Sequence, residues 1–265
     1  MLDVAQIQHY KELGYLVPPY RLPDSVLAEM RAAFDQLLAR NPDLPSDVLL
    51  QPHMEIPAAQ GVKGSKEWVK FARNPEILDI VEQLIGGDLI LWGMTVFGKP
   101  ANVGKATPWH QDGDVYPVHP LETLTVWIAL DDAAPENGCM QFIPGSHKQR
   151  KIFSRHVDDD QNLTVNLACD SEYFDASTAK NLEIKAGQIS LHDIYMVHRS
   201  TANTSAQRRA AVVMRIMPAT SYFDHYGPYG EEPDGGHVHE YTRRSLYLLR
   251  GQDRTGRNNF EIGHS

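Results

Sequence analysis

Two histidines and one aspartate of the chain could together hold a metal ion. His110 and Asp112 stand two residues apart, and His198 follows much later. Residues i and i+2 of an extended strand point to the same side, so His110 and Asp112 can bind one ion while Gln111 points away. The third ligand can come from any strand that the fold brings alongside. Two imidazoles and one carboxylate suit a non-haem Fe(II) ion and leave coordination positions open.

The surroundings of these residues matter, because a His-x-Asp triplet is a weak signal in a chain with 12 histidines. A hydrogen-bonded histidine beside a turn carboxylate would explain the triplet on its own. The sequence around the three residues, however, contains longer motifs: LTVWIALDD (124–132), ENGCM (136–140), IPGSH (143–147), RSTAN (199–203) and, after the last of these, Arg209. This combination favours the metal site.

With these motifs the chain resembles the phytanoyl-CoA dioxygenase family of oxygenases, which depend on Fe(II) and 2-oxoglutarate. The likeness runs from about Asn74 to Pro218. It implies that His110, Asp112 and His198 are the metal ligands and catalytic residues. It also implies Fe(II) as the metal, 2-oxoglutarate and O2 as co-substrates, and a double-stranded β-helix, or jelly roll, as the fold.

The resemblance further predicts which residues bind 2-oxoglutarate. Arg209 stands at the family's spacing from the last metal ligand, and a planar guanidinium binds a carboxylate through two parallel hydrogen bonds. Ser200, Trp127 and Thr95 match positions that line the co-substrate pocket, although Trp127, in its apolar strand, is equally explained as a core residue. Arg208 should lie on the opposite face of the strand and be solvated.

Other histidines have spacings that resemble ligand pairs. His192 shares strand parity with His198, but six residues of unbroken strand would separate the two by roughly 20 Å. His192 is therefore assigned a structural role. His237 and His239 lie in a Gly-rich acidic tail without a third partner, so a solvated loop is the expected structure there.

The identity of Asp112 bears on the reaction. Family members that halogenate have Gly or Ala at this place, which opens a site for chloride, so Asp112 favours hydroxylation of a small molecule with release of succinate and CO2. Desaturation, ring closure or epimerisation on the same iron is the first alternative. A cupin-like metal-binding protein without redox chemistry is another, and Arg209 argues against it because such a protein needs no clamp for 2-oxoglutarate. A degenerate, non-catalytic family member is a third, against which the intact triad argues.

Two segments are the predicted substrate-recognition regions, because loops at the mouth of a barrel commonly carry specificity. The first is 51–56 with Lys63, Lys66 and Lys70, whose charges could equally form a solvated helical face. The second is the loop 114–119 together with the Tyr-rich tail. The family serves fatty acyl-CoA, amino acids, small phosphonates and secondary metabolites, so the sequence leaves the substrate open.

Composition narrows the class of protein. The 265 residues are 42% hydrophobic and 22% charged, which is ordinary for a globular protein. A net charge of −9 argues against nucleic acid or an anionic membrane as the main partner, and no apolar run is as long as a membrane span. Two cysteines, Cys139 and Cys169, and a start without signal-peptide character favour a reducing, cytoplasmic location. The oligomeric state is left open.

The order of elements predicts a mainly β (α+β) fold and a single oxygenase domain, residues 1–265. Residues 1–87 read as mainly helical, with helices over 3–14, 24–40 and 74–85 that pack along one sheet. The predicted jelly-roll core, 88–218, has strands at 89–99, 123–130, 140–143, 182–184, 188–192 and 210–217. The remainder, 219–265, is expected to be a tail near the active-site mouth. The strand pattern permits a jelly roll, and the resemblance supplies it.

Overall fold

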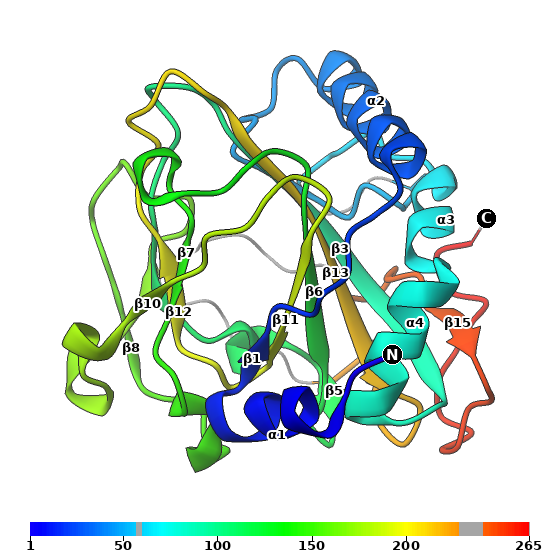
Figure 1. Ribbon diagram of the computed structural model, residues 1–265. Helices are drawn as coiled ribbons and strands as arrows, with labels where there is room; N and C mark the ends of the chain where they lie inside the picture. Colours follow the sequence, from blue (N-terminus) through cyan, green and yellow to red (C-terminus); the bar gives the residue numbers. More distant parts are fainter. Residues whose placement is uncertain (57–59, 228–240, 265) are drawn as a thin grey trace.

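Two antiparallel β-sheets form the centre of the molecule in the computed structural model, which describes residues 1–56, 60–227 and 241–264 (Figure 1). The larger sheet has the order β1-β11-β6-β13-β3-β15, and β2 also pairs with β3. Its strands are β1 (Tyr15–Leu16), β2 (Val48–Leu50), β3 (Leu89–Lys99), β6 (Leu124–Ala129), β11 (Ile189–Asp193), β13 (Arg209–Pro218) and β15 (Tyr247–Arg250).

The smaller sheet has the order β10-β7-β12-β4. Its strands are β4 (Thr107–His110), β7 (Met140–Phe142), β10 (Lys180–Asn181) and β12 (His198–Ser200). Two further antiparallel pairs are β5 (Val118–His119) with β14 (Tyr222–Phe223), and β8 (Arg155–Val157) with β9 (Leu167–Cys169). The smaller sheet supplies two of the three predicted metal ligands, His110 and His198.

Both faces of the larger sheet are buried. On β13, Val212, Met214 and Ile216 pack into the cluster that the helices cover, whereas Ala211 and Val213 pack into a second cluster shared with the smaller sheet. A strand covered on both faces has no polar side to show, which is why β6 and β13 read as nearly continuous apolar runs. The interior between the two sheets is where the candidate site lies.

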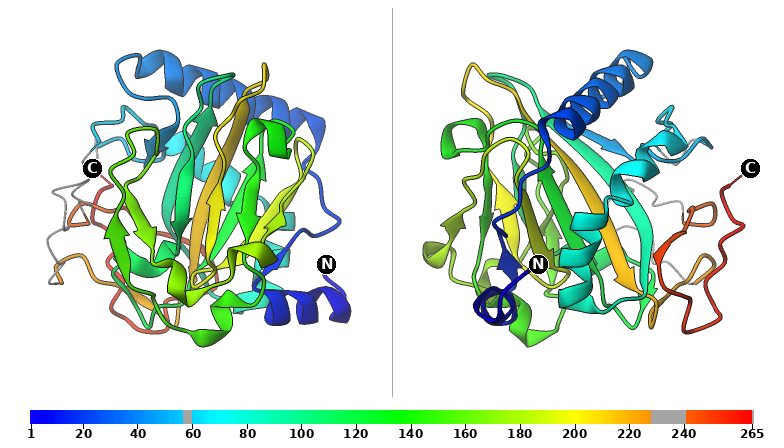
Figure 2. Two further views of the ribbon diagram at one scale, coloured as in Figure 1. Left: turned by 90° about the vertical axis from the view of Figure 1, so that its left-hand side faces the viewer. Right: turned by 45° about the vertical axis from the view of Figure 1, so that its right-hand side comes forward.

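The part of the chain that the structure describes has four α-helices beside the sheets: α1 (Val4–Leu13), α2 (Asp24–Arg40), α3 (Val69–Ala72) and α4 (Pro75–Ile85). The Asp3 side chain accepts a hydrogen bond from the Gln6 amide to begin α1, and Gly14 ends that helix with a left-handed φ of 81°. Figure 2 shows α2 and α4 lying along the outer face of the larger sheet, where their apolar faces join its core cluster. The predicted packing of N-terminal helices on one sheet is confirmed.

The predicted elements agree with the structure in most places, with one error and several omissions. Residues 182–184 were expected to form a strand, but β10 ends at Asn181 and Ile184 makes only an isolated bridge with Ala133. The short strands β1 and β2 were not expected, because two or three residues carry too little alternation to be recognised. The tail supplies β14 and β15, and β15 pairs with the edge strand β3. The predicted single-domain organisation stays a prediction.

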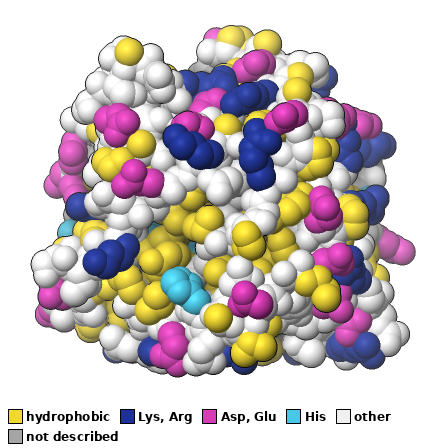
Figure 3. Space-filling model, in the orientation of Figure 1, with side chains coloured by type: hydrophobic (Ala, Val, Ile, Leu, Met, Phe, Trp, Pro, Cys, Tyr) yellow, Lys and Arg dark blue, Asp and Glu magenta, His cyan; other side chains and the backbone are white. Residues whose placement is uncertain are grey.

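On the face shown in Figure 3, basic and acidic side chains are interspersed around apolar ones. Within the described ranges, no helix is both long and apolar enough to cross a bilayer. Residues 237–239, whose histidine spacing was considered above, lie outside the described residues.

Candidate metal centre

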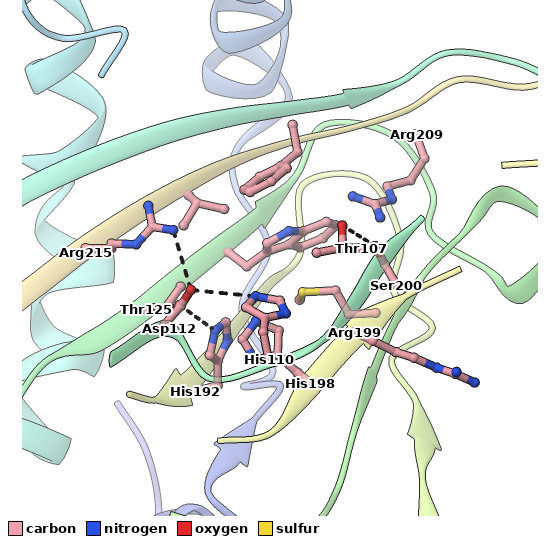
Figure 4. A pocket seen from close by; sticks show the side chains of 14 residues that line it. Thr107, His110, Asp112, Thr125, His192, His198, Arg199, Ser200, Arg209 and Arg215 are labelled. Atoms are coloured by element: carbon pink, nitrogen blue, oxygen red, sulfur yellow. Dashed lines mark hydrogen bonds and ion pairs between the residues drawn. The ribbon is translucent and has the colours of Figure 1, made fainter. Parts of the chain in front are cut away.

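The three predicted ligands meet at one point between the sheets. His110 ends β4 and His198 begins β12, and the two are register partners with ring centroids 4.1 Å apart. Asp112 begins a short 3-10 helix (Asp112–Val115) directly after β4. One ligand atom from each of the three residues lies within 4.8 Å of the others, and Figure 4 shows the three side chains converging. The structure therefore assembles the group that strand parity and the resemblance predicted.

Hydrogen bonds orient both imidazoles toward a common point. His110 Nδ1 is 2.9 Å from the carbonyl of Pro108, and His198 Nδ1 is 3.0 Å from the carbonyl of Met196. A ring that donates through Nδ1 keeps the lone pair of Nε2 free for a metal. Burial lowers the pKa of both histidines, so they are neutral and able to act as ligands.

The carboxylate of Asp112 is held from several sides. Thr125 donates to its Oδ2 at 2.9 Å, Tyr116 donates to its Oδ1 at 3.4 Å, and Nη2 of Arg215 lies 3.6 Å from Oδ1. Burial on its own would raise the pKa of Asp112, but Arg215 and the neighbouring histidines lower it well below its usual range. Asp112 is therefore ionised, and the donor set of two neutral imidazoles and one carboxylate fits a divalent iron ion.

The predicted distance between His192 and His198 is wrong. Their ring centroids are only 4.8 Å apart, and His192 Nε2 lies 3.5 Å from Oδ2 of Asp112. The two histidines do not share one straight strand: His192 is on β11 of the larger sheet, and the chain turns through 194–197 into β12 of the smaller sheet. His192 is thus a buried neighbour of Asp112 that sequence reasoning placed far from the metal.

A cavity extends from the three ligands to Arg209. The predicted residues Ser200, Trp127 and Arg209 line it, together with apolar side chains such as Phe97. Thr95 is not among the described residues that line the cavity, and its hydroxyl accepts a hydrogen bond of 2.8 Å from Arg215. The predicted contact between Thr95 and 2-oxoglutarate stays a prediction, whereas the other three lie where an acidic co-substrate would fit.

Arg209 is a buried cation at the end of this cavity away from Asp112. It is 2% exposed, and its Nε and Nη2 donate to the carbonyl of Gly138 at 3.1 and 2.5 Å. Burial lowers the pKa of Arg209 to about 10, so the guanidinium stays charged at neutral pH. No carboxylate of the described residues forms an ion pair with it. A buried guanidinium in this situation is suited to bind an anionic ligand.

Arg208 points the other way, as strand parity predicts. Its Nε lies 2.9 Å from Asp131 and its Nη1 lies 3.1 Å from Asp35 of α2, and its guanidinium lies over the ring of Phe34. The side chain is partly exposed rather than fully solvated. These ion pairs make Arg208 a matched control for Arg209.

Lys99 is a buried lysine near Arg209 that the sequence did not reveal. It pairs in register with Arg209, is 2% exposed, and donates a hydrogen bond through Nζ to the carbonyl of Lys105. Burial, together with the charge of Arg209, lowers the pKa of Lys99 to about 6. Lys99 is therefore largely neutral at pH 7, which limits its repulsion of Arg209.

Replacing Lys99 with methionine is expected to remove a pH dependence of stability. The pKa of Lys99 falls from 10.5 to about 6 on folding, so the unfolded chain binds one more proton between these pH values. The free energy of unfolding of the wild type should then rise by up to about 1.4 kcal/mol per pH unit. Urea unfolding at pH 7, 8 and 9 measures the slope. Lys180→Met changes an exposed lysine and should keep the wild-type slope of the unfolding free energy against pH. If Lys99→Met also kept that slope, Lys99 would have to be protonated in the folded protein.

The fold and the site together define an antiparallel two-sheet protein with a facial His-Asp-His metal site. A family model described as phytanoyl-CoA dioxygenase (PhyH) matches residues 10–211. The chain therefore belongs to the phytanoyl-CoA dioxygenase family, as the sequence motifs predicted.

Two individual relatives match only part of the chain, at 35% and 28% sequence identity. A phytanoyl-CoA dioxygenase domain-containing protein 1 homolog of Caenorhabditis elegans is 35% identical over 133 residues, which is 48% of this chain and 46% of that protein. A probable alpha-ketoglutarate-dependent hypophosphite dioxygenase of Stutzerimonas stutzeri is 28% identical over 57% of this chain and 53% of its own. The chain thus spans about half the length of the curated relatives it matches.

Among solved structures, the non-heme alpha ketoglutarate dependent carbocyclase SnoK from nogalamycin biosynthesis is similar over most of both chains. Its TM-score is 0.65 and its sequence identity is 25%, over 84% of this chain and 86% of the carbocyclase. Because the similarity covers 84% of this chain, it extends well beyond the motifs around the metal ligands.

Proposed function

We propose that the chain is an Fe(II)- and 2-oxoglutarate-dependent dioxygenase built on a double-stranded β-helix, and that it hydroxylates a small molecule. The observation that carries the proposal is a single cavity with His110, Asp112 and His198 at one end and the buried Arg209 at the other. The family match and the alpha-ketoglutarate dependence of two similar proteins support it. A cytoplasmic location stays a prediction.

Each residue of the cavity would have its own role in binding 2-oxoglutarate. Arg209 would bind the far carboxylate of 2-oxoglutarate, and Ser200, whose hydroxyl is 3.2 Å from that of Thr107, would add a hydroxyl to the same end. Trp127 forms a wall beside Arg209, with its ring 5.6 Å from the guanidinium carbon. Iron in this site would supply activation of O2 coupled to decarboxylation of 2-oxoglutarate to succinate and CO2.

The remaining contacts keep the site in place. Thr125 and Arg215 fix the carboxylate of Asp112, and the two backbone carbonyls fix the imidazoles, so the open face of the metal would point into the cavity. The apolar side chains of Phe97, Met140 and Val213 limit the water in contact with it.

The experiment that tests this function measures succinate. Wild-type protein supplied with Fe(II), 2-oxoglutarate and O2 should release succinate above its uncoupled background when the correct compound is present in a pool of candidate small molecules. The Asp112→Ala protein in the same pool should show no such increase. An increase in succinate release that persists in Asp112→Ala would contradict the proposal. So would a wild-type protein that binds neither Fe(II) nor 2-oxoglutarate and releases no additional succinate with any pool.

Ring closure is the second candidate outcome, because the similar solved structure SnoK is a carbocyclase. Hydroxylation adds one oxygen atom to the product, whereas ring closure removes two hydrogen atoms. The mass of the product therefore separates the two outcomes without any change to the proposed iron site.

Chlorination is not expected. Asp112 occupies the position that a halide would need, and its negative charge disfavours a second anion beside the metal. The wild-type product formed at high chloride concentration should therefore show added oxygen or lost hydrogen by mass spectrometry. A chlorine isotope pattern in that product would refute the assignment of Asp112 as a ligand.

A further inference from the structure

Two buried arginines lie beside the metal centre, on the side away from Arg209. Arg215, on β13, is 8% exposed, and Arg244, in the turn before β15, is 4% exposed. Figure 4 shows Arg215 and Arg209 at opposite ends of the pocket, with Asp112 between them. A β-carbon on Gly93 would lie 3.4 Å from Nη1 of Arg244 and 3.8 Å from Cδ of Arg215, so the two arginines flank this glycine.

Among the described residues, Asp112 is the one carboxylate at ion-pair distance from this pair. Arg215 has Asp112 at 3.6 Å, but that carboxylate also faces the metal site. Arg244 has no carboxylate at ion-pair distance among the described residues; its contacts are a long hydrogen bond of 3.5 Å to the carbonyl of Trp92 and the ring of Tyr241. The Nε atoms of both arginines lack a hydrogen-bond partner. Burying an unpaired charge is strongly unfavourable, so a pair like this one is suited to receive an anion.

A buried histidine without hydrogen-bond partners and a buried glutamine lie near these arginines. His53 is completely buried, and neither of its ring nitrogens has a hydrogen-bond partner. Burial and the charge of Arg244 lower the pKa of His53 to about 3, so it is neutral. Nε2 of Gln51 is 3.8 Å from the β-carbon position of Gly93. Gln51 and His53 belong to the first predicted substrate-recognition region.

The second predicted recognition region reaches the same arginines. The ring of Tyr116 lies 5.4 Å from the guanidinium carbon of Arg215, and its hydroxyl donates to Asp112. Arg215 also lines the cavity that holds the metal ligands. The two loops that the sequence singled out for specificity therefore converge on Arg215 and Arg244, next to the metal centre.

The charges of the proposed reaction point to a ligand for this pair. The charges of Fe(II) and Arg209 are cancelled by those of Asp112 and dianionic 2-oxoglutarate, so Arg215 and Arg244 remain uncompensated. We propose that the substrate carries an oxyanion, a carboxylate or a phosphate, that binds between Arg215 and Arg244 and holds the oxidised carbon near Asp112. This inference rests on the proposed function, because it treats the cavity as the site of substrate oxidation.

Thermal unfolding of Arg244→Gln tests the inference without knowledge of the natural substrate. The probes are phenylacetate and inorganic phosphate at constant ionic strength, with phenylacetamide as the neutral match of the acid. In buffer of low oxyanion content, Arg244→Gln should have a higher Tm than the wild type, because an unpaired buried charge is gone. Phenylacetate or phosphate should raise the Tm of the wild type, with an apparent affinity at least about tenfold weaker in the variant.

Two further variants show whether the response to the oxyanion depends on the charge at position 244. Arg244→Lys keeps the charge and should retain most of the response, and Arg208→Gln removes a surface arginine and should respond like the wild type. An equal response of wild type and Arg244→Gln, an equal effect of acid and amide, or a lower Tm of Arg244→Gln in the low-oxyanion buffer would each overturn the inference. The probe with the larger effect tells a carboxylate from a phosphate.

Binding of 2-oxoglutarate separates this inference from the proposed function. If Arg244→Gln also loses its affinity for 2-oxoglutarate in the presence of Fe(II), the arginine pair binds the co-substrate and the assignment to the substrate is wrong. If instead the wild type binds no 2-oxoglutarate with Fe(II), the proposed function fails, while the Tm measurements still decide whether the arginine pair is an oxyanion site.

Discussion

Replacing His198 with alanine is expected to lower the affinity for Fe(II) by more than about 100-fold and to abolish turnover. Changes to groups that merely orient ligands cost about 10- to 100-fold in metal affinity, so loss of a ligand should cost more. His198 is buried, and its Nε2 is directed toward Asp112 and His110 by the hydrogen bond at Nδ1. Competition with a chromophoric chelator under anaerobic conditions measures the affinity.

Variants of two other histidines serve as comparisons for His198→Ala. His192→Asn removes a neighbour of Asp112 and should weaken Fe(II) binding by about tenfold, within the range for orienting groups. His156→Ala removes a half-exposed histidine that pairs with Asp170 and should leave the affinity unchanged. If His192→Asn were as harmful as His198→Ala, His192 would have to be counted among the ligands.

The second large effect is expected at Arg209. Arg209→Ala removes a charge-assisted, two-point contact, which should cost on the order of 2–4 kcal/mol in binding of 2-oxoglutarate. That corresponds to roughly a 30- to 900-fold increase in its Michaelis constant. Arg208→Ala breaks ion pairs with Asp131 and Asp35 instead, so it should lower stability slightly and leave the Michaelis constant unchanged. A larger effect of Arg208→Ala would mean that the register is off by one residue.

The metal site could be predicted because the spacing of two ligands is a local pattern of the sequence and the family resemblance supplies the third ligand. Strand parity places His110 and Asp112 on one side of the chain, and the motif after His198 identifies the third ligand. Arg209 followed from the spacing that the family resemblance implies between that ligand and the arginine. In the structure, the pairing of β4 with β12 brings His110 and His198 together, and β13 of the larger sheet supplies Arg209 to the same cavity.

The rest of the site depends on where the chain changes direction. His192 lies near the metal because residues 194–197 carry the chain from one sheet to the other, and no periodicity reveals such a turn. Arg215 had a signal that was not used: it interrupts an otherwise apolar strand that is buried along its whole length. A charged residue at a buried strand position needs polar contacts, and here Arg215 donates a hydrogen bond to Thr95 and lies 3.6 Å from Asp112.

Arg244 had no comparable signal. It lies in a polar tail, where an arginine is ordinarily solvated, but that tail packs against β3 and Arg244 is buried there. Lys99 was hidden for a similar reason, since a lysine at the end of a strand is usually exposed. Both are buried by residues distant in sequence, as the contact of Arg244 with Trp92 illustrates.

The central claim is that metal and 2-oxoglutarate share one cavity, and an anaerobic calorimetric titration tests it most directly. 2-Oxoglutarate is added to wild-type protein with and without one equivalent of Fe(II), and to Arg209→Ala and Arg208→Ala with Fe(II). We predict one binding site per chain that requires Fe(II), is retained in Arg208→Ala and is lost in Arg209→Ala. Binding of equal affinity without the metal, or binding unaffected by the change at Arg209, would contradict the account.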